Sequence, residues 1–326
     1  MISEKNISDF LYSRYAVAIF AIITIIATHF AINHGEVTPI LDNKGFGLAP
    51  ANQWIPFGTW SMIVNIILNI AIALLMIYIN KVFNVLRNPT IIFAGLFFIL
   101  QMPITDITGQ LYGGTLLCAT MLICAFFLFT TFNNYNPYAI YIILCILSLG
   151  AFFQYAFLFY VPIILLGCAQ MRIFNLRTSL AALFGMLTPP WILYGFGILN
   201  YENASLPALS NIFEHISIEE ALQMLLTIGL TIFLCIGSWF VNIVKIISYN
   251  ARTRAFNGFI ALLAFTTILL IIIDFSNYIV YIPLLNSCAA LQLAHLFTIY
   301  EARRSYLGIL GVFLVYSALY IWGLWI

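Results

Sequence analysis

Three carboxylates in the links between apolar runs are the acidic residues best placed for chemistry at a membrane surface. Glu36 and Asp42 closely follow the first apolar run, and Asp106 lies in the turn after the third. Acid–base work on a lipid-linked substrate needs a carboxylate near the membrane face whose pKa is tuned by its neighbours. The sequence therefore offers these three as candidate catalytic residues, although solvated loop residues of these types need no functional explanation.

Two arginine pairs are candidates for binding lipid head groups or phosphates. Arg172 and Arg177 lie in the link before the seventh apolar run, and Arg303 and Arg304 are adjacent just before the last. Basic clusters beside membrane segments attract anionic lipid. The alternative is that these residues only determine topology, because basic residues accumulate in cytoplasmic loops.

The sequence carries none of the compact motifs that mark many enzyme sites. It has no phosphate-binding P-loop, no GxGxxG, no HExxH and no nucleophile elbow. All six cysteines lie in apolar runs and none forms a CxxC pair, so we interpret them as small buried hydrophobic residues. We expect no metal site and no cofactor, and the net charge of +1 gives no indication of nucleic-acid binding.

Polar residues inside the apolar runs are functional candidates because burying them in a bilayer is costly. His29 and His295 suggest a relay, yet they lie near opposite membrane faces and we do not expect them to meet. Asn65 and Asn69 are one turn apart, and we interpret them as hydrogen-bonding groups between helices. Asp274 follows an unbroken apolar run and is either an exposed turn residue or a carboxylate held at the interface.

The composition decides which elements must hold these residues. The chain has 326 residues, of which 63% are hydrophobic and 7% charged, and no soluble domain of this length could cover so much apolar surface. Apolar runs of about 17 to 25 residues can cross a hydrocarbon core about 30 Å thick. We therefore predict an all-α, polytopic transmembrane helix bundle that forms one domain over residues 1–326.

About eleven spans fit the sequence. Their expected bounds are Tyr15–Asn33, Trp60–Ile79, Thr90–Ile104, Leu111–Thr131, Tyr138–Gly150, Phe152–Gln170, Ser179–Leu199, Ala221–Val244, Phe256–Asp274, Tyr278–Thr298 and Tyr306–Ile326. The third and fifth are short, so each could instead form half of a hairpin buried in protein at membrane depth. Ala181 and Gly185 form a pair of small residues that allows close helix approach.

The distribution of charge predicts the orientation. With these spans, eleven of the twelve Lys and Arg residues fall on the side of the N-terminus, and only Lys44 falls on the other. Most acidic residues map to the side of Lys44. Because positive charge accumulates in cytoplasmic loops, we predict a cytoplasmic N-terminus, an external C-terminus and a multi-pass location in the cell inner membrane.

Motifs in the middle third of the chain resemble those of a protein family. The stretch from Pro103 to Gly195 contains PITDITGQLYGG, FLFYVPIILLG, the basic link RIFNLRTSLAALFG, and LTPPWILYG. This order resembles a family of multi-spanning inner-membrane proteins of unassigned function from Bacteroidota. The positions that carry the resemblance are Tyr160, Pro162, Arg172, Arg177, Gly185, Thr188 and Pro189.

The same order of features is more weakly similar to the helical scaffold of GT-C-type glycosyltransferases. Those enzymes take a sugar from a polyprenyl-phosphate donor at the outer face and use an acidic residue of the first external loop. The resemblance implies that Glu36 or Asp42 stands in that place. The chain departs from the pattern, because its first external loop is short, lacks paired acids and is accompanied by no large external domain.

We expect a non-enzymatic or accessory protein that acts on envelope lipids or is a subunit of a larger membrane complex. Its partners would be the lipid bilayer and either a polyprenyl-linked lipid or other membrane-protein subunits, with no nucleic acid. One alternative is a GT-C-like transferase that uses a polyprenyl-phosphate-linked sugar. Another is a transporter of a small molecule or lipid, which needs a polar cavity near the membrane midplane.

Overall fold

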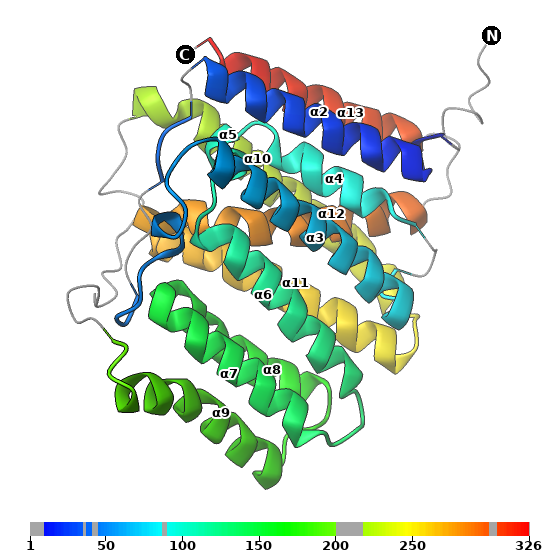
Figure 1. Cartoon of the computed structure of the whole chain (residues 1–326). Coiled ribbons are helices and arrows are strands. Elements are labelled where there is room, and N and C mark those ends of the chain that lie inside the picture. The colour runs from blue at the N-terminus through cyan, green and yellow to red at the C-terminus, as the bar shows by residue number, and fades with distance from the viewer. Residues whose placement is uncertain are drawn as a thin grey trace.

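A computed structural model describes residues 10–34, 37–40, 45–86, 90–199, 218–299 and 305–325. These parts of the chain are helices joined by short links, and they contain no strand. The longer helices run roughly parallel or antiparallel to one another as a bundle (Figure 1). The predicted all-helical class is therefore confirmed.

The bundle is built from eleven principal helices within the described residues. They are α2 (Arg14–Asn33), α3 (Thr59–Phe83), α4 (Ile92–Gln101), α6 (Gly113–Thr130), α7 (Pro137–Phe153), α8 (Val161–Gln170), α9 (Leu176–Gly195), α10 (Ile218–Ile246), α11 (Ala251–Ile273), α12 (Tyr278–Ile299) and α13 (Ser305–Gly323). Shorter turns of helix are η1 (Ala51–Gln53), α5 (Thr105–Gly109), η2 (Tyr155–Tyr160) and η5 (Phe275–Asn277).

Seven helices in the described parts are long and apolar enough to cross a membrane, as expected of a membrane-embedded protein. They are α2, α3, α6, α10, α11, α12 and α13. The other expected spans fall on the shorter apolar helices α4, α7 and α8, and on α9, which contains Pro189 and Pro190. These four lie alongside the seven (Figure 1), so the number of complete crossings stays a prediction.

The sixth predicted span differs most from the structure. A continuous helix was expected over Phe152–Gln170, but the backbone at Gln154 is extended, with φ −156° and ψ 126°. The chain then resumes as the 3₁₀ turn η2 before α8 begins. Pro162 stands near the start of α8, where the N–H that proline lacks would have no partner within the helix. The interruption therefore ends at a position where a helix accommodates proline.

The third predicted span is a ten-residue helix, α4, that would cross about half of the hydrocarbon thickness. Every residue from Ile92 to Gln101 is buried. Two of its last carbonyl groups accept hydrogen bonds from neighbouring helices: the hydroxyl of Thr24 donates to Phe98 (3.1 Å), and the amide of Asn286 to Leu100 (3.4 Å). A short helix is tolerated here because protein surrounds it and pairs its backbone.

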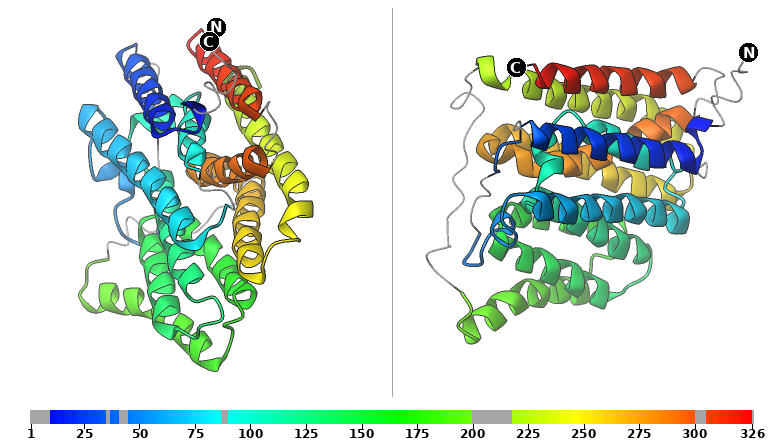
Figure 2. Two further views of the ribbon diagram at one scale, coloured as in Figure 1. Left: turned by 90° about the vertical axis from the view of Figure 1, so that its right-hand side faces the viewer. Right: turned by 45° about the horizontal axis from the view of Figure 1, so that its top comes forward.

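The interior is organised around α12, which contacts α4, α6, α10, α11 and α13. Figure 2 shows α12 enclosed by these elements, while α9 lies at the edge of the bundle against α7. A single apolar cluster extends through the described helices. Among its largest fully buried members are Phe93, Phe97, Phe129 and Phe259.

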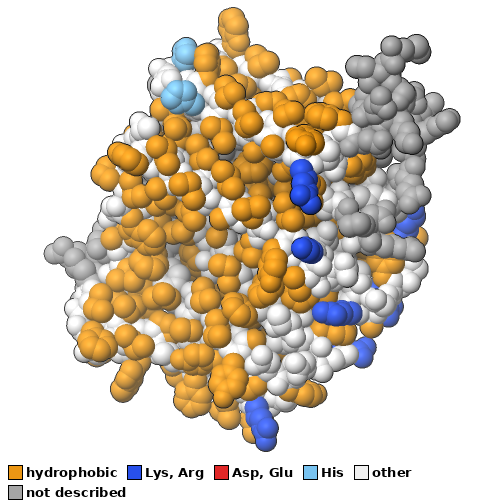
Figure 3. Space-filling model, turned by 45° about the vertical axis from the view of Figure 1, so that its right-hand side comes forward, with side chains coloured by type: hydrophobic (Ala, Val, Ile, Leu, Met, Phe, Trp, Pro, Cys, Tyr) orange, Lys and Arg blue, Asp and Glu red, His pale blue; other side chains and the backbone are white. Residues whose placement is uncertain are grey.

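Charged side chains are sorted between the two ends of the bundle. The described Lys and Arg residues stand at helix ends that share one side, because consecutive helices run in opposite directions: Arg14, Lys81, Arg172, Arg177, Lys245, Arg252 and Arg254. Figure 3 shows basic groups along one edge of a broad apolar face. The links that carry Asp106 and Asp274 lie at the opposite end (Figure 1).

The predicted close approach at Gly185 is present between α9 and α7. A Cβ at Gly185 would lie 2.5 Å from the carbonyl oxygen of Tyr141 and 3.2 Å from the Cβ of Leu144. Next to this contact, the Ser148 hydroxyl donates to the carbonyl of Met186 (2.8 Å). The absence of a side chain at Gly185 therefore sets the spacing of the two helices.

Replacing Gly185 by Ala is expected to destabilise the protein by about 1–3 kcal/mol, because the new methyl group meets backbone that cannot move alone. The measurement is thermal unfolding of the purified chain in detergent. Gly229→Ala is the matched control, since nothing lies within 4 Å of a Cβ there. Equal melting temperatures for the two variants would contradict the close packing of α7 on α9.

Candidate functional site

Asp274 is a fully buried carboxylate, with 0% of its surface exposed. An ionisable side chain inside a membrane protein is a functional candidate by default, because burying it in hydrocarbon is costly. Of the two alternatives drawn from the sequence, an exposed turn residue or a carboxylate held at the interface, the exposed residue is wrong. Asp274 does lie in a turn, between α11 and η5, but the neighbouring helices cover it completely.

Three buried side chains donate hydrogen bonds to the carboxylate of Asp274, and the exposed Ser276 hydroxyl lies 3.5 Å from its Oδ1. The Tyr281 hydroxyl donates to Oδ2 (2.8 Å), and the Tyr155 hydroxyl lies 3.3 Å from Oδ1. The Asn277 amide donates to both oxygens, at 2.9 and 3.0 Å, and also to the Tyr155 hydroxyl. We call Asp274, Tyr155, Asn277 and Tyr281 the Asp274 cluster. These hydrogen bonds offset part of the cost of burying the polar carboxyl group.

Two interrupted helices bring the Asp274 cluster together. One interruption is the extended backbone at Gln154, which places Tyr155 at the start of η2. The other is the end of α11, where Asp274 has φ −111° and ψ 56° and the chain passes through η5 into α12. Asn277 and Tyr281 follow Asp274 by three and seven residues, so both fall on one helical face with it.

The Asp274 cluster can act as a buried proton acceptor or as a fixed connection between helices. The described Lys and Arg side chains stand at the far end of the bundle, so hydroxyl and amide dipoles solvate this carboxylate. Those bonds join the α11–α12 turn to the α7–α8 break. The geometry therefore supports a structural role directly.

Asp106, the one predicted catalytic residue within the described chain, is half-buried in α5. Its Oδ1 accepts a hydrogen bond from the backbone N–H of Thr38 (2.7 Å). Burial raises the pKa of the Asp106 carboxyl, and the hydrogen bond from Thr38 partly opposes that shift. The Gln110 side chain also pairs with this loop, accepting from the Ile40 N–H (3.0 Å) and donating to the Thr38 carbonyl (2.6 Å).

Glu36 and Asp42 lie outside the described residues, as do Arg303 and Arg304. The described segment 37–40 falls between the first two in sequence, and Asp106 binds it directly. Arg172 and Arg177 are exposed at the opposite end of the bundle from Asp106. The structure therefore does not bring the predicted phosphate-binding arginines together with the described catalytic candidate.

Arg172 has a local role in ending α8. Its φ of 59° is in the left-handed region, which is uncommon for a residue with a side chain. This conformation lets the N–H of Ile173 bond back to the carbonyl of Cys168 (3.1 Å), as helix-terminating motifs do. Arg172 therefore reverses the chain into the link before α9.

Of the two amides in α3 that we interpreted as links between helices, Asn65 makes such a link and Asn69 bonds within its own helix. Asn65 donates to the carbonyls of Ile107 (2.8 Å) and Thr108 (3.0 Å) and accepts from the Thr115 hydroxyl (2.7 Å). Asn69 donates to the carbonyl of Asn65 (3.0 Å). Asn65 thus fixes α5 and the start of α6 against α3.

His29 and His295, the two histidines considered for a relay, lie apart. His29 is exposed near the end of α2 and is 3.0 Å from the amide of Asn33. His295 is buried near the other end of the bundle, where its ring meets that of Tyr249 edge-on at 5.8 Å. A relay between these two residues has no support in their positions.

Sequence reasoning missed the partners of Asp274. Tyr155 and Tyr281 stand in apolar, aromatic-rich segments where tyrosine is common. The signal present was the spacing of Asp274, Asn277 and Tyr281 on one face. The expected boundary between Gly150 and Phe152 lies close to the break at Gln154, but nothing in the sequence indicates that this break brings Tyr155 to Asp274, more than a hundred residues away.

Comparisons with family profiles, curated proteins and solved structures give no match to this chain. The resemblances to the Bacteroidota family and to GT-C enzymes therefore stay predictions.

Replacing Asp274 by Ala is expected to lower the free energy of unfolding by about 3 kcal/mol, because buried donors on Tyr155, Tyr281 and Asn277 lose their acceptor. Tyr281→Phe, which removes one donor, should cost about 1 kcal/mol. Unfolding of the purified chain by heat or denaturing detergent measures both. A stability of Asp274→Ala equal to wild type would show that the carboxylate does not hold these helices together.

Proposed function

We propose that the chain is a multi-spanning protein of the cell inner membrane with about eleven crossings. Its N-terminus is cytoplasmic and its C-terminus external. It works as an accessory protein or subunit, acting on envelope lipids or within a membrane complex. The described basic residues support this orientation, because they occupy one end of the bundle and such residues accumulate on the cytoplasmic side.

The functional proposal rests on the position of the larger hollows between the described helices. One, with a volume of about 360 Å³, lies between α7, α8 and α9 at the edge of the bundle. Apolar side chains form most of its wall, among them Leu144, Val161, Leu165 and Leu183. A hollow of this kind opens toward lipid. It suits a protein that contacts lipids or other membrane-protein subunits at the lateral surface of its helix bundle.

Two interior polar groups support the same proposal. The carboxylate of Asp274 and the amide of Asn65 are bound by other groups of the chain. Both serve to hold helices in place. The apolar cluster fills the space between the described helices. Transport through a polar midplane cavity remains an alternative without a supporting observation of its own.

One observation favours the transferase alternative. Asp106 has a raised pKa and directly contacts the loop that contains Thr38, between Glu36 and Asp42 in the sequence. A GT-C-like enzyme would use such a carboxylate at the outer face as a base that takes the proton of an acceptor hydroxyl, while the sugar leaves its polyprenyl phosphate. The two proposals therefore differ in whether these three acids are needed.

The orientation is tested by cysteine labelling in intact cells. Phe57→Cys stands before α3 at the proposed external end, and Tyr135→Cys stands between α6 and α7 at the cytoplasmic end; both positions are exposed. A membrane-impermeant maleimide should label the first in intact cells and the second only after permeabilisation. Wild type is the control, since five of its cysteines are buried and Cys145 is half-buried. The reverse pattern would invert the topology.

The role of the acids is tested by complementing a strain that lacks the chain with Glu36→Gln/Asp42→Asn/Asp106→Asn. An accessory protein should restore resistance of the envelope to detergent as fully as wild type, because no proton transfer is required of these groups. Membrane levels of the variant are measured by immunoblot. Loss of complementation at a normal protein level would favour the transferase.

A further inference from the structure

A second groove on the outside of the bundle lies between α8, α10 and α11, with a volume of about 410 Å³. Its wall is largely apolar and includes Ile243, Ile247 and Leu262. Three polar side chains, Gln170, Arg254 and Asn257, also line it. The groove therefore combines an apolar trough with a positive charge.

The polar side chains belong to the basic end of the bundle. Arg254 is exposed in the first turn of α11, and its Nη1 lies 3.5 Å from the carbonyl of Ile247 at the end of α10. A guanidinium has five N–H donors, so this contact leaves others for a phosphate. Gln170 is exposed at the end of α8, and its Nε2 would lie 2.6 Å from a Cβ at Gly258. The glycine lets this amide approach α11 one turn beyond Arg254.

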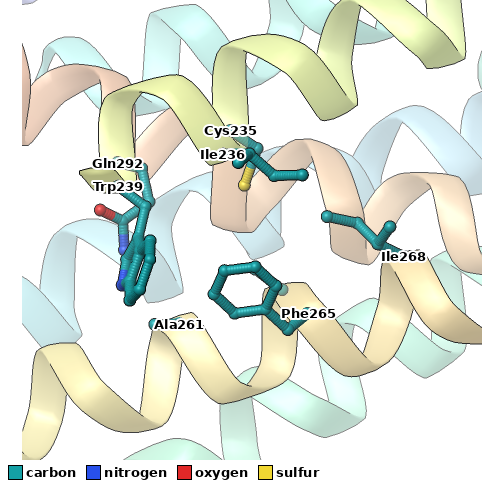
Figure 4. A pocket seen from close by; sticks show the side chains of 8 residues that line it. Cys235, Ile236, Trp239, Ala261, Phe265, Ile268 and Gln292 are labelled. Atoms are coloured by element: carbon teal, nitrogen blue, oxygen red, sulfur yellow. The ribbon is translucent and has the colours of Figure 1, made fainter. Parts of the chain in front are cut away.

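Aromatic rings close the other end of the groove. Trp239 of α10 and Phe265 of α11 meet edge to face, with centroids 4.9 Å apart and an interplanar angle of 89°. Figure 4 shows these two rings with Ala261 on one side, and Cys235 and Ile268 beyond them around a smaller apolar hollow. An occupant of the outer groove would therefore stop against this ring pair.

The length of the groove matches one leaflet of a bilayer. Along α11, the eleven residue steps from Arg254 to Phe265 rise about 16 Å. Half of a typical hydrocarbon core is about 15 Å. The groove thus extends from head-group level at Arg254 to the middle of the membrane.

We propose that this groove binds one anionic phospholipid from the leaflet at the basic end. Its phosphate lies at Arg254 and Gln170, and one acyl chain follows the wall past Leu262 to the Trp239–Phe265 pair. This inference deepens the proposed function and rests on the membrane placement stated there. A lipid fits better than a second copy of the chain or a partner helix, because only the lipid brings a phosphate to the charged end.

The test is native mass spectrometry of the purified full chain with added phosphatidylglycerol or phosphatidylcholine of the same acyl chains. Wild type should retain phosphatidylglycerol preferentially. Arg254→Gln should weaken that binding about fivefold, because one basic residue contributes at about that level to attraction of anionic lipid. Arg14→Gln is the matched control: it removes the same charge from an exposed position at the same end of the bundle, away from the groove.

The apolar part of the site needs its own variants. Leu262→Trp fills the trough and should reduce retention of long-chain phosphatidylglycerol at least as much as Arg254→Gln. Val244→Trp is the control, since Val244 is 73% exposed on α10 and does not line the groove. If Leu262→Trp lowers the melting temperature, Ile247→Trp at the rim, where the side chain is 62% exposed, replaces it.

Several outcomes would overturn the proposal. Equal loss of phosphatidylglycerol binding in Arg254→Gln and Arg14→Gln would indicate an effect of general surface charge. Unchanged retention in the groove-filling variants would place the acyl chain elsewhere, and equal retention of both lipids would remove the charge recognition. A dimer that Leu262→Trp dissociates would make the groove an interface between two copies. Because purified protein is used, failure here leaves the complementation result standing.

Discussion

Hydrogen-bonding groups that leave water for hydrocarbon must find their partners within the protein, and this requirement accounts for much of the described structure. With only 7% of residues charged, the chain meets it mainly with hydroxyls, amides and backbone carbonyls. Tyr155, Asn277 and Tyr281 surround one carboxylate, and Asn65 binds two carbonyls and a hydroxyl. In each case the polar groups join helices that apolar packing alone would leave free to rotate or slide.

The helical class and the sorting of charge were accessible from sequence because both depend on composition and on the length of apolar runs. α3, α6, α11 and α12 fall close to their expected bounds for this reason. The sequence placed a boundary between two spans at residues 150–152, but it did not show that α7 continues to Phe153 and that the extended residue is Gln154, because the residues around the break are as apolar as those of a continuous span. Hydropathy measures how readily a segment enters a membrane. It carries little information about where a helix is interrupted within the membrane.

At the candidate site, too, some features could be predicted from the sequence and others could not. The carboxylates were visible as residue types, and Asp106 does lie beside the loop that contains Thr38. The surroundings of Asp274 depend on contacts between segments more than a hundred residues apart, which no local pattern encodes. The groove at Arg254 was likewise hidden, since it needs the end of α8 to approach Gly258 of α11. Residues able to take part in chemistry were thus easier to find in the sequence than the residues that contact them in the fold.

The short helix α4 has a consequence for how the protein is made. Its ten residues are too few to be held across a bilayer as an independent span, and one of its terminal carbonyls is bound by Asn286, 186 residues further along the chain. While the ribosome is still producing the second half, that carbonyl lacks its final donor. The contacts of α4 are therefore complete only once α12 has been made. Biogenesis would then be completed from the C-terminal half, whose arrival locks the N-terminal half in place.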